Sequence, residues 1–302
     1  MLRKMKRTAV LAGLLALVAC VPTNPSRTRT VEPLAETCDG GPVPAHISVN
    51  GRSARLFAPP GAGDGTPRPL LVSLHPFVLG ATAWEDYSAL ASTAAARGMY
   101  VLLPEGIEPG PRWSVPGGLA SETDDVAFID ALIAETARTV CIDGDRVFAA
   151  GFSAGAALAV GLSCELPGRF RAVVGSGGAN LTSLCFDAAP TSAMILHGTA
   201  DSVVPLTGNE VPFTPPTGLH LDSVAASFAS RNDCGPRPAA ELRSPTLAVT
   251  TYSCASAQLV DVRVQGMGHA WAGGNGLIDL FVGPGDASFS ATNLVLDFFD
   301  NA

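Results

Sequence analysis

The chain has 302 residues, of which 47% are hydrophobic and 15% are charged, and its formal net charge is −8 at pH 7. An acidic surface disfavours nucleic acids and other polyanions as partners, so we expect no nucleic-acid ligand and a substrate that is neutral or held in a local pocket. The length suits one large α/β domain better than two small ones. No segment after the first twenty residues is long and apolar enough to be transmembrane.

The first twenty residues have the features of an export signal. Four basic side chains lie within the first seven positions, and a short apolar run from Thr8 to Ala19 follows. The run ends in Leu17-Val18-Ala19-Cys20, which resembles the bacterial lipobox, where cleavage precedes a cysteine that becomes diacylated. Ordinary secretory cleavage near Ala19, with Cys20 incidental, is the alternative. Loss of the four basic residues would change the formal charge from −8 to −12.

This interpretation places the protein outside the cytoplasm. It would be an exported lipoprotein, anchored to a bacterial membrane or cell surface through Cys20, or a secreted protein. Residues 21–37 are rich in Pro, Thr, Ser and Arg and contain little to bury, so we expect a flexible tether there. The globular domain is then expected over residues 38–302.

The cysteines indicate disulfide bonds. Without Cys20 six remain, and an even number in an exported chain is typical of disulfides. Counting leaves the connectivity open, and our hypothesis is pairing between neighbours. This predicts the pairs Cys164–Cys185, Cys234–Cys254 and Cys38–Cys141. No Cys-x-x-Cys or His-rich spacing supports a zinc site, and we expect neither a metal nor a cofactor.

Apolar runs and turn signals predict the elements in chain order. The alternating stretch 46–58 contains Asn50-Gly51 and predicts a hairpin. Short apolar runs predict buried strands of a parallel sheet, and longer segments predict helices. The expected strands are 70–74, 100–103, 147–150, 172–175, 194–196, 248–254 and 259–264; the expected helices are 82–97, 121–139, 154–164, 219–230 and 287–299. The fold class is therefore α/β, with a mostly parallel central sheet, an N-terminal antiparallel hairpin and helices on both faces.

Two details of this segmentation bear on a functional site. Ser121 and Asp124 are spaced like an N-cap residue and its capping-box partner at the start of the helix 121–139. The segment 206–218 is rich in proline, and we expect it to cover the site.

The pentapeptide Gly151-Phe152-Ser153-Ala154-Gly155 lies between an expected strand and an expected helix. This pattern is typical of a nucleophile elbow, in which the chain turns sharply and exposes the serine hydroxyl. Glycine is needed on either side because the turn is strained and crowded. Ser153 is therefore the candidate nucleophile.

A serine hydroxyl needs a base, and the base needs an orienting carboxylate. In α/β-hydrolases these residues follow the serine in the order acid, then histidine. Asp201 lies just after the strand 194–196, although loop aspartates more often stabilise turns. His269 follows the last strand and is the candidate base. His197, at a strand end, is expected to be a packed, hydrogen-bonded ring.

The negative oxygen that develops during attack needs two backbone N–H donors. One is expected from Ala154, directly after the nucleophile and at a helix N-terminus. The other is expected from the loop that begins His75-Pro76-Phe77. Because Pro76 has no N–H, Phe77 is the candidate donor, with Val78 as the alternative.

Several motifs together resemble one family. The set, which occurs in one order along nearly the whole chain after Cys38, resembles the secreted polyhydroxybutyrate depolymerase and feruloyl/acetylxylan esterase family of α/β-hydrolases. The motifs are Leu74-His75, Trp113, Asp124-Asp125-Val126-Ala127-Phe128-Ile129, Asp145-Arg146-Val147-Phe148, the pentapeptide 151–155, His197-Gly198-Thr199-Ala200-Asp201 and Gly268-His269-Ala270-Trp271.

The resemblance implies an α/β-hydrolase fold and ester hydrolysis with Ser153, Asp201 and His269 as the triad. It also implies that Asp124-Asp125 opens a helix and serves structure. The chain departs from the family pattern at two positions. Pro76 stands where the family usually has glycine, and Ala272 stands where it often has proline.

The expected function is that of an extracytoplasmic serine carboxylesterase that forms an acyl-enzyme. Feruloyl or acetyl esters on polysaccharides and hydroxyalkanoate esters are both open as substrates. Trp271, Trp113 and His75 are candidate substrate contacts, although the tryptophans could equally anchor loops, and Trp113 lies in a loop with poor burial prospects. We expect a monomer. The alternatives are a serine peptidase of the same fold and a catalytically inactive, surface-anchored binding protein.

Overall fold

The computed structural model of the protein describes residues 29–35, 38–77, 79–107, 112–118, 123–208, 218–275 and 283–302. Several sequence predictions fall outside this range. They are the signal segment 1–20 with its candidate lipidation site Cys20, residues 21–28 and 36–37 of the expected tether, the alternative donor Val78, the expected N-cap Ser121, and most of the proline-rich segment, namely residues 209–217.

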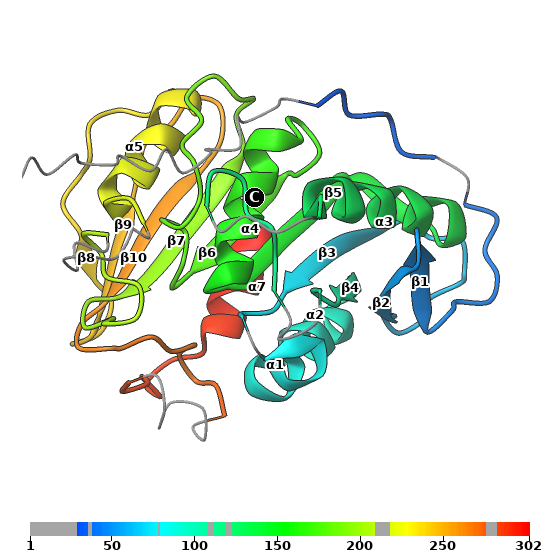
Figure 1. The fold of residues 1–302 in the computed structure, drawn as a ribbon, viewed down its shortest axis with the longest axis horizontal. Helices are drawn as coiled ribbons and strands as arrows, with labels where there is room; N and C mark the ends of the chain where they lie inside the picture. Colours follow the sequence, from blue (N-terminus) through cyan, green and yellow to red (C-terminus); the bar gives the residue numbers. More distant parts are fainter. Residues whose placement is uncertain are drawn as a thin grey trace, which may run out of the picture.

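A single ten-stranded sheet organises the molecule (Figure 1). Its order is β1 (His46–Val49), β2 (Arg52–Phe57), β4 (Tyr100–Pro104), β3 (Arg68–Leu74), β5 (Ile142–Phe152), β6 (Ala172–Ser176), β7 (Ser192–Gly198), β10 (Leu259–Val264), β9 (Leu247–Thr251) and β8 (Glu241–Leu242). The strands from β4 to β10 in this order are parallel, and the strands at both edges pair antiparallel. The predicted parallel sheet with an N-terminal antiparallel hairpin is confirmed. The short strand β8, with two exposed residues, had no apolar signal in the sequence.

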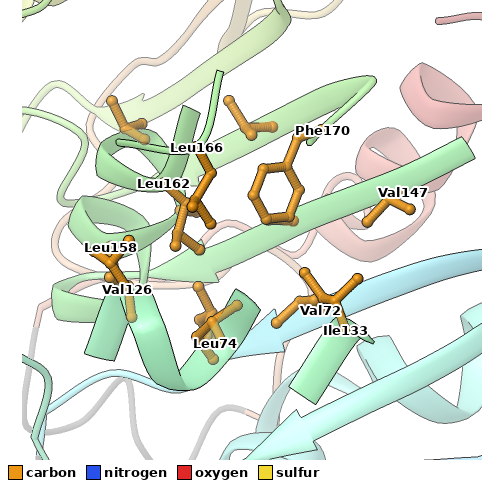
Figure 2. Packing of buried hydrophobic residues seen from close by; sticks show 14 of the residues in the cluster. Val72, Leu74, Val126, Ile133, Val147, Leu158, Leu162, Leu166 and Phe170 are labelled. Carbon is orange, nitrogen blue, oxygen red and sulfur yellow. The ribbon is translucent and has the colours of Figure 1, made fainter. Parts of the chain in front are cut away.

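Helices cover both faces of the sheet, as predicted. One apolar core lies between the sheet and α3 (Asp125–Thr139), α4 (Ala154–Glu165) and α5 (Leu221–Arg231). A second core lies on the opposite face, under α1 (Gly80–Ser88), α2 (Leu90–Ala96) and α7 (Ala291–Asp300). Successive residues of the central strands alternate between the two cores, which explains their continuous apolar runs. Figure 2 shows the first core, with side chains from α3, α4 and β3 packed together.

The predicted helix 82–97 is two helices. Ala89 adopts φ 50°, which ends α1 and turns the chain before α2 begins. At this break polar side chains accept hydrogen bonds from backbone N–H groups. The composition of the segment alone could not reveal these bonds. The Ser88 hydroxyl accepts the N–H of Leu90, and the Glu85 carboxylate accepts the first amides of α2 at 2.8 and 2.9 Å.

The predicted N-cap of α3, Ser121, is wrong by three residues. Its N-cap is Asp124, whose carboxylate accepts the N–H of Ala127 at 2.9 Å. Ser121, the predicted cap, lies outside the described residues. Arg29 also pairs with Asp124 at 2.7 Å, so one carboxylate serves two partners. The structural role that the resemblance implied for this acidic pair is confirmed.

Residues 29–35, which belong to the expected tether over 21–37, make contacts with the domain. The Arg29 N–H donates to the carbonyl of Glu165, and the Arg169 guanidinium donates to the carbonyl of Glu32 at 2.8 Å. The side chain of Leu34 packs against the first core. Isolated basic and apolar residues in this proline-rich stretch therefore hold it against the domain. No helix in the described part of the chain has the length and apolar character to cross a membrane.

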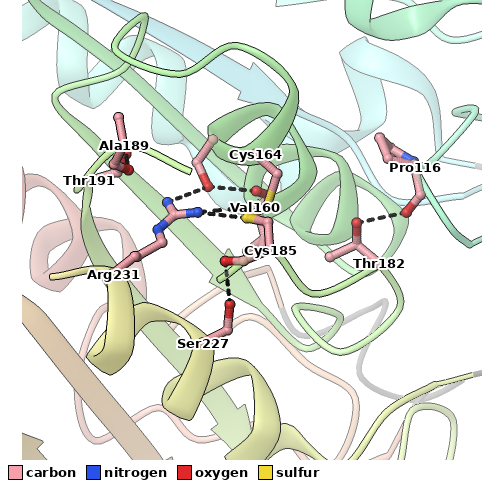
Figure 3. The surroundings of a disulfide bond; sticks show 10 residues. Pro116, Val160, Cys164, Thr182, Cys185, Ala189, Thr191, Ser227 and Arg231 are labelled. Carbon is pink, nitrogen blue, oxygen red and sulfur yellow. Dashed lines mark hydrogen bonds between the residues drawn. A yellow bond between two sulfur atoms is a disulfide. The ribbon is translucent and has the colours of Figure 1, made fainter. Parts of the chain in front are cut away.

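All three predicted disulfides are present, and the neighbour pairing is confirmed. Figure 3 shows the bond that joins Cys164, in α4, to Cys185, in the loop after β6. The Arg231 guanidinium lies against it, with one nitrogen 2.8 Å from the Cys185 sulfur and another 2.8 Å from the Ser163 hydroxyl. Burial lowers the pKa of Arg231 to about 10, so the side chain stays charged at neutral pH.

The cap of α3 can be tested by two substitutions at Asp124. We expect Asp124→Ala to lower the free energy of unfolding by about 1 kcal/mol, because α3 loses its cap. Asp124→Asn keeps a capping oxygen and removes only the charge facing Arg29, so its loss should be about half as large or less. Urea denaturation followed by circular dichroism measures both values. Equal losses would show that the charge, and not the cap, matters.

Candidate active site

Ser153 occupies a sharp turn between β5 and α4. Its φ of 54° and ψ of −119° are unusual for a residue other than glycine, which is the strain expected of a nucleophile elbow. The flanking glycines leave no space for side chains. A Cβ on Gly151 would lie 2.3 Å from the backbone of Gly155, and one on Gly155 would lie 2.1 Å from the carbonyl oxygen of Leu74. The first turn of α4 therefore lies directly against the end of β3.

A hydrogen-bonded chain joins the three residues of the candidate triad. His269 Nε2 lies 3.0 Å from the Ser153 hydroxyl oxygen, and its Nδ1 lies 2.8 Å from a carboxylate oxygen of Asp201. An ionised carboxylate only accepts, so Nδ1 carries the proton and Nε2 is free to accept the serine proton. The geometry is that of a nucleophile, a base and an orienting acid. The side chains come from the ends of β5, β7 and β10.

Asp201 is buried and well supplied with donors. Its second carboxylate oxygen accepts the N–H groups of Val203 and Val204 at 2.9 and 2.7 Å. Burial by itself would raise the pKa of Asp201. The hydrogen bonds from His197 and His269, the charge of the His269 ring and the Val204 N–H outweigh burial and hold the pKa far below its usual range. The carboxylate is thus ionised whenever the site is folded near neutral pH.

His197 is a site residue that the sequence analysis did not assign to the site. As predicted, its ring is buried and hydrogen-bonded, with Nε2 2.8 Å from the Val204 carbonyl. Nε2 also lies 3.3 Å from Asp201, so two histidines face one carboxylate. Because the Val204 carbonyl only accepts, Nε2 carries the proton; among the described residues Nδ1 has no hydrogen-bond partner. The only sequence signal for this contact is the four-residue spacing between His197 and Asp201, and a spacing alone does not show that the loop folds back.

The loop that carries the candidate donor Phe77 begins beside the elbow. The N–H of Ala154 is the first amide of α4, where no acceptor exists within the helix. Phe77 lies two residues beyond His75, whose carbonyl oxygen would be 2.7 Å from a Cβ on Gly155. Within the described residues neither N–H donates a hydrogen bond to a backbone carbonyl of a turn or loop. The structure therefore places the loop after β3 beside the turn that carries Ser153.

The two tryptophans do not form a substrate platform. Trp113, expected to be poorly buried, is 2% exposed, and Trp271 is 1% exposed. The indole N–H of Trp113 donates to the His75 carbonyl at 2.8 Å, and that of Trp271 donates to the Thr292 hydroxyl at 2.9 Å. Both side chains anchor loops, which was the alternative interpretation. His75 is also fully buried and presents no surface to a substrate.

Aromatic packing supports the ring of His269. The Phe152 ring lies 4.8 Å from it between centroids, and Trp84 stacks on the far side of this ring at 6.0 Å. The Tyr87 hydroxyl accepts the backbone N–H of Trp271 at 2.8 Å. Large side chains of α1 and β5 thus pack against the loop that carries His269. No cluster of potential metal ligands occurs among the described residues.

Comparison with known proteins identifies the family. The family model for Phospholipase/Carboxylesterase matches residues 121–211. The putative esterase NocK of Nocardia uniformis subsp. tsuyamanensis is 30% identical over 275 residues, covering 82% of this chain and 78% of that protein. The chain belongs to the esterase family of α/β-hydrolases.

Two further similar proteins are a feruloyl esterase and an acetyl xylan esterase. Feruloyl esterase C of Emericella nidulans is 29% identical over 194 residues, which cover 62% of this chain and 64% of that protein, just under two thirds of its length. The structure of an acetyl xylan esterase from Aspergillus awamori aligns with a TM-score of 0.58 and 14% identity, covering 83% of this chain and 94% of that one. This likeness confirms the predicted α/β-hydrolase fold of the esterase.

The depressed pKa of Asp201 predicts a pH dependence of stability. The ionised group stabilises the folded state above its unfolded pKa of about 4, and this contribution is lost as the pH falls below that value. Asp201→Asn lacks the contribution. The free energy of unfolding should therefore fall more steeply between about pH 6 and pH 3 in the wild type than in the variant. Urea denaturation at several pH values measures this, and parallel curves would contradict it.

Proposed function

We propose that the protein is a serine carboxylesterase in which Ser153 is the nucleophile, His269 the general base and acid, and Asp201 the orienting carboxylate. The hydrogen-bonded chain from Asp201 through His269 to Ser153 carries this proposal. The N–H groups of Ala154 and Phe77 hold the oxyanion. The family of the chain supports hydrolysis of carboxylic esters.

The reaction proceeds through an acyl-enzyme. The Ser153 oxygen attacks the ester carbon as its proton moves to His269, and the carbonyl electron pair moves onto the oxygen facing the two amides. Collapse of this intermediate breaks the bond to the alcohol, which leaves with the proton from His269. Water then attacks the acyl group, gives a proton to His269, and the acid leaves as that proton returns to Ser153. Asp201 stabilises the charged ring in both steps.

The substrates we propose are esters of polysaccharides that carry feruloyl or acetyl groups. The names of two relatives, feruloyl esterase C and acetyl xylan esterase, support this class. Hydroxyalkanoate esters are the alternative, which rests on the sequence resemblance alone. The formal charge of −8 favours neutral esters over anionic ones.

We propose that the protein works outside the cytoplasm, where Cys20 carries the lipid anchor. Three disulfides support an oxidising compartment, because such bonds are rare in the cytosol. Residues 29–35 lie against the domain, so in this proposal the tether is shorter than the expected segment 21–37.

The nucleophile is tested by Ser153→Ala, with Ser256→Ala as a matched control at an exposed serine on another part of the fold. We expect Ser153→Ala to lower kcat for p-nitrophenyl acetate about 10⁶-fold, because no acyl-enzyme can form. A fluorophosphonate probe should label the wild type and the control but not the variant. Retained hydrolysis by folded Ser153→Ala would overturn the proposal. Labelling at Ser153 would also exclude an inactive binding protein.

The substrate class is tested by comparing kcat/KM across three esters and one amide. We expect methyl ferulate or acetylated xylan to be hydrolysed faster than hydroxybutyrate oligomers, and all of these faster than a peptide p-nitroanilide. All of these esters would be cleaved by the same acyl-enzyme mechanism, so differences in kcat/KM reflect how well the acyl and alcohol groups fit the site. A preference for the oligomers would favour the hydroxyalkanoate alternative. A preference for the anilide would favour the peptidase.

A further inference from the structure

His75 has both ring nitrogens engaged, and its partners define its tautomer. Nε2 lies 2.8 Å from the backbone nitrogen of Gly106 and farther, 3.4 Å, from a carboxylate oxygen of Glu105. The Gly106 N–H points at Nε2 and needs its lone pair, so this nitrogen carries no proton. Nδ1 lies 2.8 Å from the carbonyl oxygen of Pro76, which only accepts, so Nδ1 carries the proton. The ring is fully buried. His75 is therefore a neutral donor to the carbonyl of its own next residue.

This bond restrains the peptide that follows. The proline ring already restricts φ of Pro76, and the hydrogen bond to its carbonyl fixes the direction of the Pro76–Phe77 peptide plane. In a trans peptide the N–H points away from the carbonyl. The direction of the Phe77 N–H is therefore set by the ring of His75. Rotation of this peptide plane would turn the Phe77 N–H to another direction, and Pro76 has no N–H that could replace it.

The ring and the carbonyl of His75 are held from the other side by Trp113. The two rings lie 4.5 Å apart between centroids, and the indole N–H donates to the His75 carbonyl. The next residue, Ser114, donates its N–H to Asp125, which also pairs with Arg52 at 2.6 Å. The buried Asp125 at the start of α3 thus holds the loop that carries Trp113, and Trp113 in turn holds His75.

We propose that His75 is a positioning residue, which holds the Phe77 N–H in the oxyanion site through the Pro76 carbonyl. The inference rests on the proposed function, because a directed amide matters only if Ser153 attacks a carbonyl. It assigns a role to the departure at Pro76. Because Pro76 has no N–H to donate, the loop depends on the N–H of Phe77. The direction of that N–H must then be fixed by a contact from outside its own peptide, and His75 makes this contact.

Two substitutions separate the two hydrogen bonds of the ring. The amide nitrogen of His75→Asn takes the place of Nδ1 and can still donate to Pro76, but the acceptor for Gly106 is lost. The amide oxygen of His75→Gln reaches the place of Nε2 and can still accept from Gly106, but the donor to Pro76 is lost. A structural role of the ring would make both variants less stable without changing kcat per folded site.

We expect His75→Gln to lower kcat for p-nitrophenyl acetate about 10²- to 10³-fold, with little change in KM, as for loss of one oxyanion donor. His75→Asn should keep kcat within about tenfold of the wild type. The affinity for a boronic acid that mimics the tetrahedral intermediate should fall with kcat in His75→Gln. Active sites are counted with a fluorophosphonate, so that unfolded protein does not affect kcat.

Unchanged kcat in His75→Gln, or equal losses in the two variants, would overturn the inference. If neither variant folds, side-chain ¹⁵N spectra of the wild type decide it, because an Nε2-protonated His75 contradicts the proposed bond. Failure of the proposed function has a different signature. In that case the wild type itself hydrolyses no ester and Ser153 is not labelled, whatever the tautomer of His75.

Discussion

The close contact between the first turn of α4 and the end of β3 is the constraint on which the candidate site depends. A Cβ on Gly155 would lie 2.1 Å from the Leu74 carbonyl oxygen, so only glycine permits this approach. The contact places the first turn of α4, which begins at Ala154, beside the carbonyl groups of Leu74 and His75, directly before the loop that carries Phe77. It also leaves Ser153 as the residue that must absorb the turn, with a positive φ.

The other end of α4 is held just as firmly. The disulfide from Cys164 to Cys185 joins it to the loop after β6, and Arg231 brings a buried charge to the same place (Figure 3). That loop returns to the nucleophile, since a Cβ on Gly178 would lie 2.1 Å from the Ser153 carbonyl oxygen. The strained turn at Ser153 therefore lies between backbone segments that cannot move apart independently, which is how a strained conformation persists in a folded protein.

Much of the fold could be predicted from sequence because its central strands are continuous apolar runs and its elbow has a specific glycine pattern. The triad candidates could be placed by their order after successive strands. The break at Ala89 could not, because it depends on Glu85 and Ser88 satisfying amides that a continuous helix would satisfy itself. The burial of Trp113 depends on an acceptor, the His75 carbonyl, that is distant in sequence. The contact of His197 with Asp201 depends on how the loop after β7 folds back.

Pro76 and Ala272, the two positions at which the sequence departs from the pattern expected from its resemblance, lie in loops that are restrained in different ways. At position 76 the proline ring restricts φ, and His75 supplies the remaining restraint through the Pro76 carbonyl. At position 272 an alanine leaves φ free, and restraint comes from neighbours. Ala272 is buried, its carbonyl accepts the first amide of α7, and the preceding Trp271 is bound by both Tyr87 and Thr292. The loop that carries His269 is thus held by packing and hydrogen bonds to two helices, and does not need a fixed φ to keep the imidazole 3.0 Å from the Ser153 hydroxyl.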